Sequence, residues 1–341
     1  MAVNGRRLCC LLLVTILFVT VIQAQKIDQN IPFEKLREEV RTLWFNEEYD
    51  DAIALLESHR ERFKSGLPGF TIHFYLGLLH FDNENSEKGF EELNTGMDKG
   101  YFYSFFPGTQ KQIQQYADAE TILSRNESLR QKALDTTSVK VELKLPDDYD
   151  PLKKYPLIIF LHGNNSSLSS AKSEWKSVRL NEPYIVAFVQ SSSPVSSYAY
   201  NWPVSKRSRK DIQTSFTQLK KKYKIDETKI IIAGFSAGGR MSIDTIIRNT
   251  IPAVGFIGFS PAKLSDLDTH LIEQAKSKGR KGAIISGEND YLLTEQLNLI
   301  SFLKTLEYPL RVVIHSDLGH EYPKDFEYQL NRSLEFIKDR Y

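Results

Sequence analysis

One serine in this chain has the neighbours that a catalytic nucleophile needs. Ser236 lies in the run Gly-Phe-Ser-Ala-Gly-Gly at 234–239, between a compact apolar run and a segment with helical periodicity. This is the pattern G-x-S-x-G in a strand–turn–helix context. A serine hydroxyl is a weak nucleophile, and a sharp turn holds it clear of the sheet beside a base. Gly234 and Gly238 remove the side chains that such a turn would crowd.

A carboxylate follows another predicted strand at 283–286. The chain there continues as Gly-Glu-Asn-Asp at 287–290. A carboxylate in this position would orient an imidazole and stabilise its cation. We assign this role to Asp290 and keep Glu288 as the nearby alternative.

Two histidines lie past the last predicted strand, 311–314. His320 is in a glycine-flanked loop beyond the strand, where a mobile general base belongs, whereas His315 is still at the strand end and is interpreted as structural. Together with Asp317 they would make a metal site, but their spacing matches none of the usual metal motifs. We therefore expect no metal and no organic cofactor.

Backbone amides near the serine would complete the site. The predicted strand 157–161 runs into His162-Gly-Asn-Asn at 162–165. A turn here can aim the N–H of Asn164 at a developing oxyanion, and the N–H of Ala237, directly after the nucleophile, supplies a second donor. We expect the His162 side chain to brace this loop from inside.

The order Ser236, Asp290, His320 is the order of α/β-hydrolases, and residues 136–341 resemble an α/β-hydrolase of the esterase type. The runs at 155–163 and 234–242 are similar to the polyhydroxybutyrate-depolymerase and feruloyl-esterase branch, with phospholipase/carboxylesterase relatives close behind. The resemblance implies acyl transfer through a covalent serine intermediate. The chain has no long insertion that would build the cap of a lipase.

A polar loop after the predicted strand 184–189 carries three aromatic residues. Tyr198, Tyr200 and Trp202 are amphipathic side chains on the face where the site is expected. We interpret them as candidates for binding an aromatic acyl group or a sugar. The alternative is that they anchor the loop.

Short apolar runs alternate with helical patterns from residue 136 onward, which indicates a mostly parallel sheet covered on both faces. The predicted strands are 139–145, 157–161, 184–189, 230–233, 254–259, 283–286 and 311–314. The predicted helices are 207–223, 239–249, 265–278, 293–306 and 323–338. Chemistry in such sheets lies at the carboxyl ends of the strands.

The preceding segment, 25–135, has helical periodicity and predicts a small all-α domain. Trp44, Ala52, Ile53 and Leu56 recur 37 residues later as an aromatic, glycine, aromatic and leucine, which loosely resembles a tetratricopeptide repeat. A protein- or peptide-binding groove is one interpretation. We favour a structural cap packed against the following domain, because two repeats cannot bury a solenoid core alone.

Residues 1–24 have the features of an export signal: two arginines, an apolar run at 8–22 and a small residue at the end. An uncleaved anchor is the alternative. Cleavage predicts a secreted or periplasmic chain. No later run approaches the length of a membrane span, so we expect the mature chain not to cross a membrane.

Composition excludes several classes of protein. The 341 residues are 41% hydrophobic and 26% charged with a net charge of +1, which excludes a disordered chain and gives no basic excess for nucleic acid. The two cysteines, Cys9 and Cys10, both lie in the predicted signal, which excludes a disulfide scaffold.

These patterns together predict an exported serine hydrolase that cleaves carboxylic esters, with aromatic or sugar-linked esters as candidate substrates. One alternative is a serine peptidase of the same fold. Another is a catalytically silent hydrolase domain that serves as a tetratricopeptide-like scaffold for a protein or peptide partner.

Overall fold

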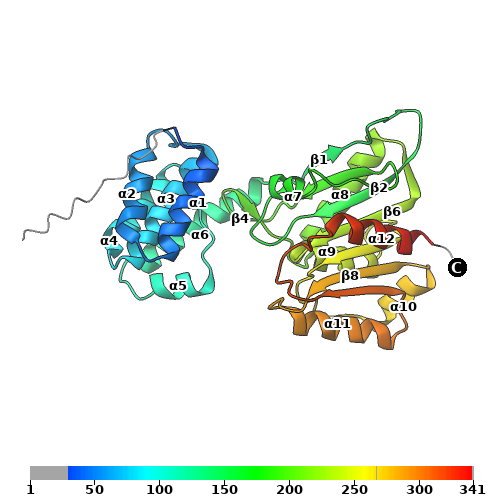
Figure 1. Ribbon diagram of the computed structural model, residues 1–341. Coiled ribbons are helices and arrows are strands. Elements are labelled where there is room, and N and C mark those ends of the chain that lie inside the picture. Colours follow the sequence, from blue (N-terminus) through cyan, green and yellow to red (C-terminus); the bar gives the residue numbers. More distant parts are fainter. Residues whose placement is uncertain (1–29, 266, 340–341) are drawn as a thin grey trace, which may run out of the picture.

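The computed structural model describes residues 30–265 and 267–339 (Figure 1). The predicted signal at 1–24, with Cys9 and Cys10, lies outside the described residues. No helix in the described ranges combines the length and the apolar character that a membrane span requires.

The first part of the described chain is helical. It consists of α1 (Phe33–Phe45), α2 (Tyr49–His59), α3 (Gly66–Asp82), α4 (Ser86–Asp98), α5 (Pro107–Ile113) and α6 (Ala119–Thr136). Helices α1 and α2 pack together, as do α3 and α4, and two apolar clusters fill the space between them. The predicted helical region is therefore present.

The faint sequence repeat falls on equivalent helices. Trp44 lies near the end of α1 and its counterpart Phe81 near the end of α3. Ala52 on α2 corresponds to Gly89 on α4, where a Cβ atom would lie only 3.0 Å from the Phe81 ring. Glycine at 89 thus permits the close approach of α3 and α4, while the likeness to tetratricopeptide repeats stays a prediction.

The second part is built on a seven-stranded sheet of order β1-β3-β2-β6-β7-β8-β9. The strands are β1 (Lys140–Lys144), β2 (Tyr155–Leu161), β3 (Ile185–Gln190), β6 (Ile225–Phe235), β7 (Gly255–Phe259), β8 (Lys281–Gly287) and β9 (Leu310–His315). β1 pairs with β3 antiparallel, and all other neighbouring pairs are parallel. The predicted mostly parallel sheet is confirmed.

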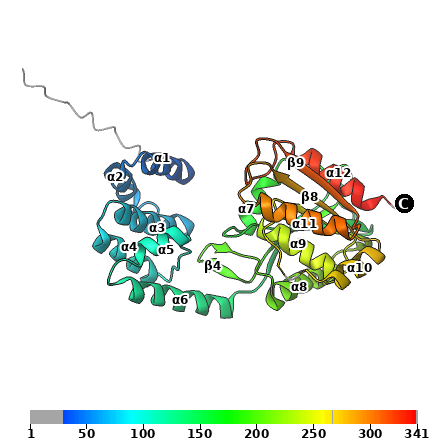
Figure 2. The same ribbon diagram turned by 90° about the horizontal axis from the view of Figure 1, so that it is seen from below.

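Helices cover both faces of this sheet (Figure 2). Side chains of α8 (Lys206–Lys222), α9 (Ala237–Ile247), α10 (Thr269–Ser277) and α11 (Leu293–Thr305) join one apolar core. Side chains of α7 (Leu168–Glu174) and α12 (Phe326–Lys338) join the core on the other face. Strands β2, β3, β7 and β8 are buried along their whole length, which is why apolar residues and glycine predominate in them.

Three elements of the second part were not predicted. Helix α7 and the two-stranded hairpin β4 (Pro194–Ser196) and β5 (Ala199–Tyr200) lie in serine-rich sequence. Serine is a weak former of both helix and strand, so these elements leave little local signal.

The β4–β5 hairpin joins the helical region to the α/β part (Figure 2). The N–H of Ser197 donates to the carbonyl of Phe102 (3.0 Å), and the N–H of Phe102 donates to the Ser197 hydroxyl (2.8 Å). The Tyr198 ring packs against Phe70 at 5.3 Å and Tyr101 at 6.3 Å between centroids. The helices therefore pack against the following part of the chain, as the sequence predicted.

Candidate active site

Ser236 occupies a sharp turn between β6 and α9. Its backbone has φ 51° and ψ −114°, a conformation that costs free energy for any residue with a side chain. The surrounding main chain holds the turn: the Ser236 N–H donates to Phe259 (2.9 Å), and the Ser236 carbonyl accepts from Ala262 (3.0 Å). The turn presents the hydroxyl at the carboxyl end of β6.

The glycines on either side of the serine are required by contact. A Cβ atom at Gly234 would lie 2.4 Å from the backbone carbon of Gly238. A Cβ atom at Gly238 would lie 2.2 Å from the carbonyl oxygen of Leu161 on β2. The predicted crowding at these two positions is therefore present, and it arises from backbone atoms that cannot move aside cheaply.

His320 lies in the loop between β9 and α12 and contacts Ser236. Its Nε2 is 2.9 Å from the Ser236 hydroxyl oxygen, and its Nδ1 is 3.0 Å from each carboxylate oxygen of Asp290. Two aromatic rings flank the imidazole, Phe235 at 5.0 Å and Tyr291 at 4.7 Å between centroids. The structure thus brings the three sequence-predicted residues into one hydrogen-bonded chain.

The Asp290 carboxylate follows β8 and has no exposed side-chain surface. Burial by itself opposes ionisation, but hydrogen bonds from the Gln296 amide (2.9 Å), the Leu292 N–H (2.8 Å) and His320 outweigh it and lower the pKa of Asp290. Glu288, the alternative considered from the sequence, is exposed to solvent. Of these two carboxylates, Asp290 is the one that is bonded to His320.

The loop after β2 has an internal brace. The buried His162 side chain contacts the Gly163 carbonyl through Nδ1 (2.7 Å) and accepts the Ser191 N–H at Nε2 (3.3 Å). This pair of bonds fits the neutral imidazole with its proton on Nδ1. Burial lowers the pKa of His162 to about 4. The side chain supports the loop from inside, as expected from the sequence.

The two amides predicted as oxyanion donors come from this loop and from the helix after Ser236. Asn164 is exposed and lines the cavity beside His320. Ala237 is buried and is the first residue of α9, where an N–H has no acceptor within the helix. Their assignment to an oxyanion hole stays a prediction.

A cavity of about 410 Å³ opens beside His320. It is lined by the loop after β2, by α7 and by the segment around the histidine. The lining residues are His162, Gly163, Asn164, Ser166, Ser170, Ala171, Glu174, Phe235, His320, Glu321 and Tyr322. Phe235, the residue before Ser236, lines the cavity together with His320.

The aromatic residues predicted to bind substrate lie elsewhere. Trp202 has 0% exposed surface and packs in the apolar core, 5.6 Å from the His162 ring. Since its side chain has no exposed surface, the position of Trp202 favours the alternative that it anchors the loop. Tyr198 packs against the helical region, and Tyr200 forms a β-bridge with Ser166. Neither tyrosine lines the cavity beside His320, and their position favours loop anchoring.

Sequence reasoning missed several side chains that shape the site. Gln296 on α11 is buried and donates to Asp290, but no motif distinguishes it. Phe235 precedes Ser236 and Tyr291 follows Asp290 in the chain. This adjacency is the one feature of the sequence that could have indicated that they lie at the site. Their contact with the His320 ring depends on how the loops meet in space.

Residues 150–293 match the family described as Phospholipase/Carboxylesterase. The match includes Ser236 and Asp290. With the sheet topology above, the match indicates the class of protein: the second part of this chain has an α/β-hydrolase fold, and residues 150–293 resemble the phospholipase/carboxylesterase family.

Several solved structures are similar to this chain. An uncharacterized protein from Bacillus cereus ATCC 10987 is 22% identical, with 91% of this chain and 99% of that chain covered at a TM-score of 0.51. S-formylglutathione hydrolase from Staphylococcus aureus is 16% identical (59% and 93% covered, TM-score 0.45), and a ferulic acid esterase is 13% identical (59% and 98%, TM-score 0.45). No curated protein matches the chain.

Proposed function

We propose that this protein is a serine esterase that hydrolyses carboxylic esters through an acyl-enzyme. One observation carries the proposal: His320 contacts Ser236 through one ring nitrogen and Asp290 through the other. A histidine in this arrangement accepts the serine proton while the carboxylate fixes its tautomer and stabilises its cation.

In the first half of the reaction, the Ser236 oxygen attacks the ester carbonyl carbon and His320 Nε2 takes the serine proton. The carbonyl π electrons move to oxygen, and the N–H groups of Asn164 and Ala237 donate to the resulting oxyanion. The tetrahedral species then collapses. The carbon–oxygen bond to the alcohol breaks, and His320 gives its proton to the departing alcohol.

In the second half, water replaces the alcohol. His320 removes a proton from the water as its oxygen attacks the acyl carbon, and the oxyanion forms again between the same two amides. Collapse breaks the bond to Ser236, which recovers its proton from His320. The products are a carboxylic acid and the free enzyme, and every proton moves between Ser236, His320, water and the alcohol.

We further propose that the protein is secreted or periplasmic, with a signal at 1–24, a helical domain at 25–135 and a catalytic domain at 136–341. Support for export comes from the sequence alone. N-terminal sequencing of the exported protein tests it, and the expected first residue is Gln25. A chain that retains residues 1–24 would contradict cleavage.

A serine peptidase and a catalytically silent scaffold are the two alternative functions. Rates of hydrolysis of p-nitrophenyl esters and of peptide anilides distinguish an esterase from a peptidase. An esterase should cleave the esters much faster than the anilides. Labelling by a fluorophosphonate probe distinguishes an active enzyme from a silent scaffold, because only an activated serine reacts with the probe.

The decisive test of the nucleophile uses two serine variants. Ser236→Ala should abolish labelling and lower kcat by ~10⁴–10⁶-fold. Ser260→Ala is the matched control, because Ser260 is buried at the end of neighbouring β7 and its hydroxyl has no hydrogen-bond partner among the described residues. Retention of more than a tenth of the activity by Ser236→Ala would refute the proposal.

A further inference from the structure

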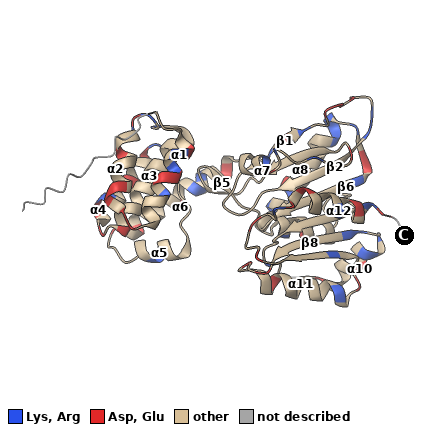
Figure 3. Ribbon diagram, in the orientation of Figure 1, with Lys and Arg blue, Asp and Glu red and all other residues tan. Residues whose placement is uncertain are grey.

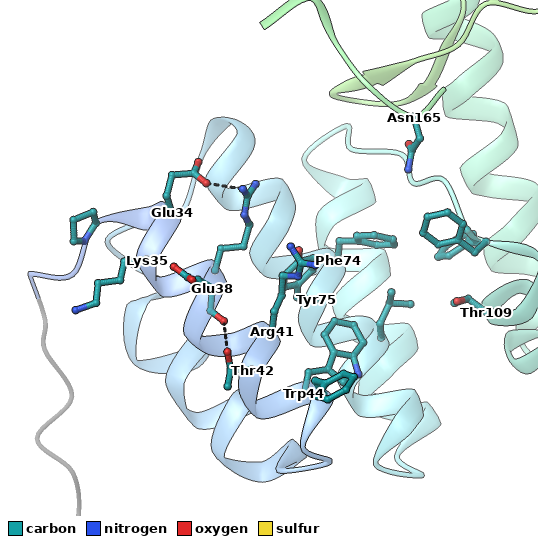
Figure 4. A pocket seen from close by; sticks show the side chains of 16 residues that line it. Glu34, Lys35, Glu38, Arg41, Thr42, Trp44, Phe74, Tyr75, Thr109 and Asn165 are labelled. Carbon is teal, nitrogen blue, oxygen red and sulfur yellow. Dashed lines mark hydrogen bonds and ion pairs between the residues drawn. The ribbon is translucent and has the colours of Figure 1, made fainter. Parts of the chain in front are cut away.

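A second and larger cleft, of about 1360 Å³, lies on the helical region (Figure 4). Helices α1, α3 and α5, with the segment just before α5, form most of its wall. One residue of the α/β part, Asn165, also lines it. Figure 4 shows Asn165 on the opposite side of the cleft from the aromatic side chains.

Six of the 16 residues that line this cleft are aromatic. They are Trp44, Phe45, Phe74, Tyr75, Phe105 and Phe106. Phe45 is 88% exposed and Phe106 is 69% exposed, and these are the only exposed phenylalanines among the described residues. Large apolar side chains gathered in one exposed hollow indicate a binding surface.

The charged residues on the rim favour a neutral occupant. Three basic side chains line the cleft, all on α1: Lys35, Arg37 and Arg41. Arg37 is paired with Glu34 at 2.6 Å, and Lys35 lies 3.8 Å from Glu39. Because two of the three cations already have acidic partners on the same helix, the cleft offers little excess charge to an anion.

Neighbouring residues of one loop line the cleft and the cavity beside His320. Asn164 lines the cavity beside His320, and the next residue, Asn165, lines the aromatic cleft. Asn165 has φ 51°, so the backbone turns between the two residues. The loop after β2 therefore borders both hollows.

We propose that the aromatic cleft binds an apolar part of the ester substrate that is remote from the scissile bond. The inference rests on the proposed esterase function and adds a substrate class: esters that carry a long alkyl or aryl group. The helical region then supplies part of the substrate-binding surface of the enzyme.

Binding is measured first, without turnover. Trp44 lines the cleft, whereas the other two tryptophans, Trp175 and Trp202, are buried in the α/β core. In Ser236→Ala, ethyl decanoate and ethyl 4-phenylbutanoate should each change the tryptophan emission with saturation, and ethyl acetate should not. The two long esters distinguish an alkyl from an aryl preference. The change should disappear when Trp44→Phe is added.

Turnover of the same three esters is then followed by acid release. Phe45→Ala/Phe106→Ala should lower the ratio of kcat/KM for the preferred long ester over ethyl acetate by roughly tenfold, because truncation removes apolar contact. Tyr328→Ala is the matched control. It removes an aromatic side chain that is 60% exposed on α12, outside the cleft, and should leave the ratio unchanged.

The outcomes separate this inference from the proposed function. If ethyl acetate is hydrolysed but neither long ester changes the Trp44 emission, the cleft inference is overturned and the esterase proposal stands. If the wild type hydrolyses none of the esters, the esterase proposal fails and the inference with it. A dimer that dissociates in Phe45→Ala/Phe106→Ala without a change in the ester ratio would make the cleft an interface between copies and overturn the inference.

Discussion

Both carboxylate oxygens of Asp290 lie 3.0 Å from Nδ1 of His320, while Glu288, two residues earlier, is exposed to solvent. Asp290→Asn keeps the shape of the side chain but replaces one acceptor by a donor. The imidazole would then hold the wrong tautomer, and kcat should fall by ~10⁴-fold. Glu288→Gln makes the same chemical change outside the hydrogen-bonded chain and should retain nearly full activity. The kcat values of both variants test this prediction. A larger loss of kcat in Glu288→Gln than in Asp290→Asn would assign the role of the carboxylate to Glu288.

Gln296 is expected to act through Asp290. Its amide lowers the pKa of the carboxylate by donating 2.9 Å to Oδ2. Gln296→Met keeps the volume of the side chain but removes the hydrogen-bond donor, so the pKa of Asp290 should rise. The acid limb of the pH–activity profile should then move to higher pH. We also expect kcat/KM at pH 7 to fall about tenfold, since a hydrogen bond to a charged group contributes ~1.5–3 kcal/mol.

The pH profile separates this positioning role from loss of packing. Gln329→Met is a control, because Gln329 is equally buried but bonds to Arg311 and Asp325 instead. It should change the melting temperature without moving the acid limb. An unshifted acid limb in Gln296→Met would remove the role assigned to Gln296.

His162 should make the stability of the protein depend on pH. Burial lowers its pKa to about 4, whereas a histidine in the unfolded chain has a pKa of ~6.5. The unfolded state therefore binds more protons between these values, and stability falls as the pH decreases through them. By linkage this group alone removes about 2 kcal/mol of the unfolding free energy between pH 7.5 and pH 5.

Denaturant unfolding at both pH values measures this contribution. His162→Gln lacks the titrating group and should show a smaller loss of stability on acidification than the wild type. His270→Gln changes an exposed histidine and should show the wild-type loss. Equal losses in His162→Gln and the wild type would contradict the prediction.

Gly238 should tolerate no side chain. Its Cβ would lie 2.2 Å from the Leu161 carbonyl oxygen and 2.5 Å from that of His162, so the nucleophile turn and the loop after β2 would have to separate. Gly238→Ala should therefore lose activity and several kcal/mol of stability. At Gly108 on α5 a Cβ meets nothing within 4 Å, and Gly108→Ala should be neutral or slightly stabilising. Melting curves and ester turnover test both, and a fully active Gly238→Ala would show that the turn is more adaptable than these distances indicate.

Trp202 should behave as a core residue. Truncation of a fully buried large aromatic side chain leaves a cavity and costs ~3–5 kcal/mol. Trp202→Ala should lower the melting temperature and reduce kcat/KM for acetyl and feruloyl esters by the same factor. A loss confined to feruloyl esters at an unchanged melting temperature would restore a substrate-binding role.

Much of the fold could be predicted because burial on both sides of a parallel sheet leaves a mark on local sequence. Strands such as β2 are mostly apolar runs, and Ser236, Asp290 and His320 lie one, three and five residues past the ends of β6, β8 and β9. Their order along the chain and their places past the strand ends are sufficient to predict Ser236, Asp290 and His320 as a group.

The remaining features depend on contacts between distant segments. The inward direction of Trp202 is set by packing against His162, forty residues earlier in the chain, and no local pattern records it. The contact of Gln296 with Asp290 and the aromatic cleft also could not be predicted, because each depends on how separate elements pack together. Periodicity describes the environment of one element and not the partner it will contact.

The bonds between Phe102 and Ser197 also bear on how the protein is made. The helical region leaves the ribosome first, yet its aromatic cluster includes the ring of Tyr198, which is synthesised almost a hundred residues after Tyr101. The helices therefore cannot complete their packing until the hairpin after β3 has emerged. During translation, part of the aromatic surface of the helical region therefore stays exposed until the hairpin has been synthesised.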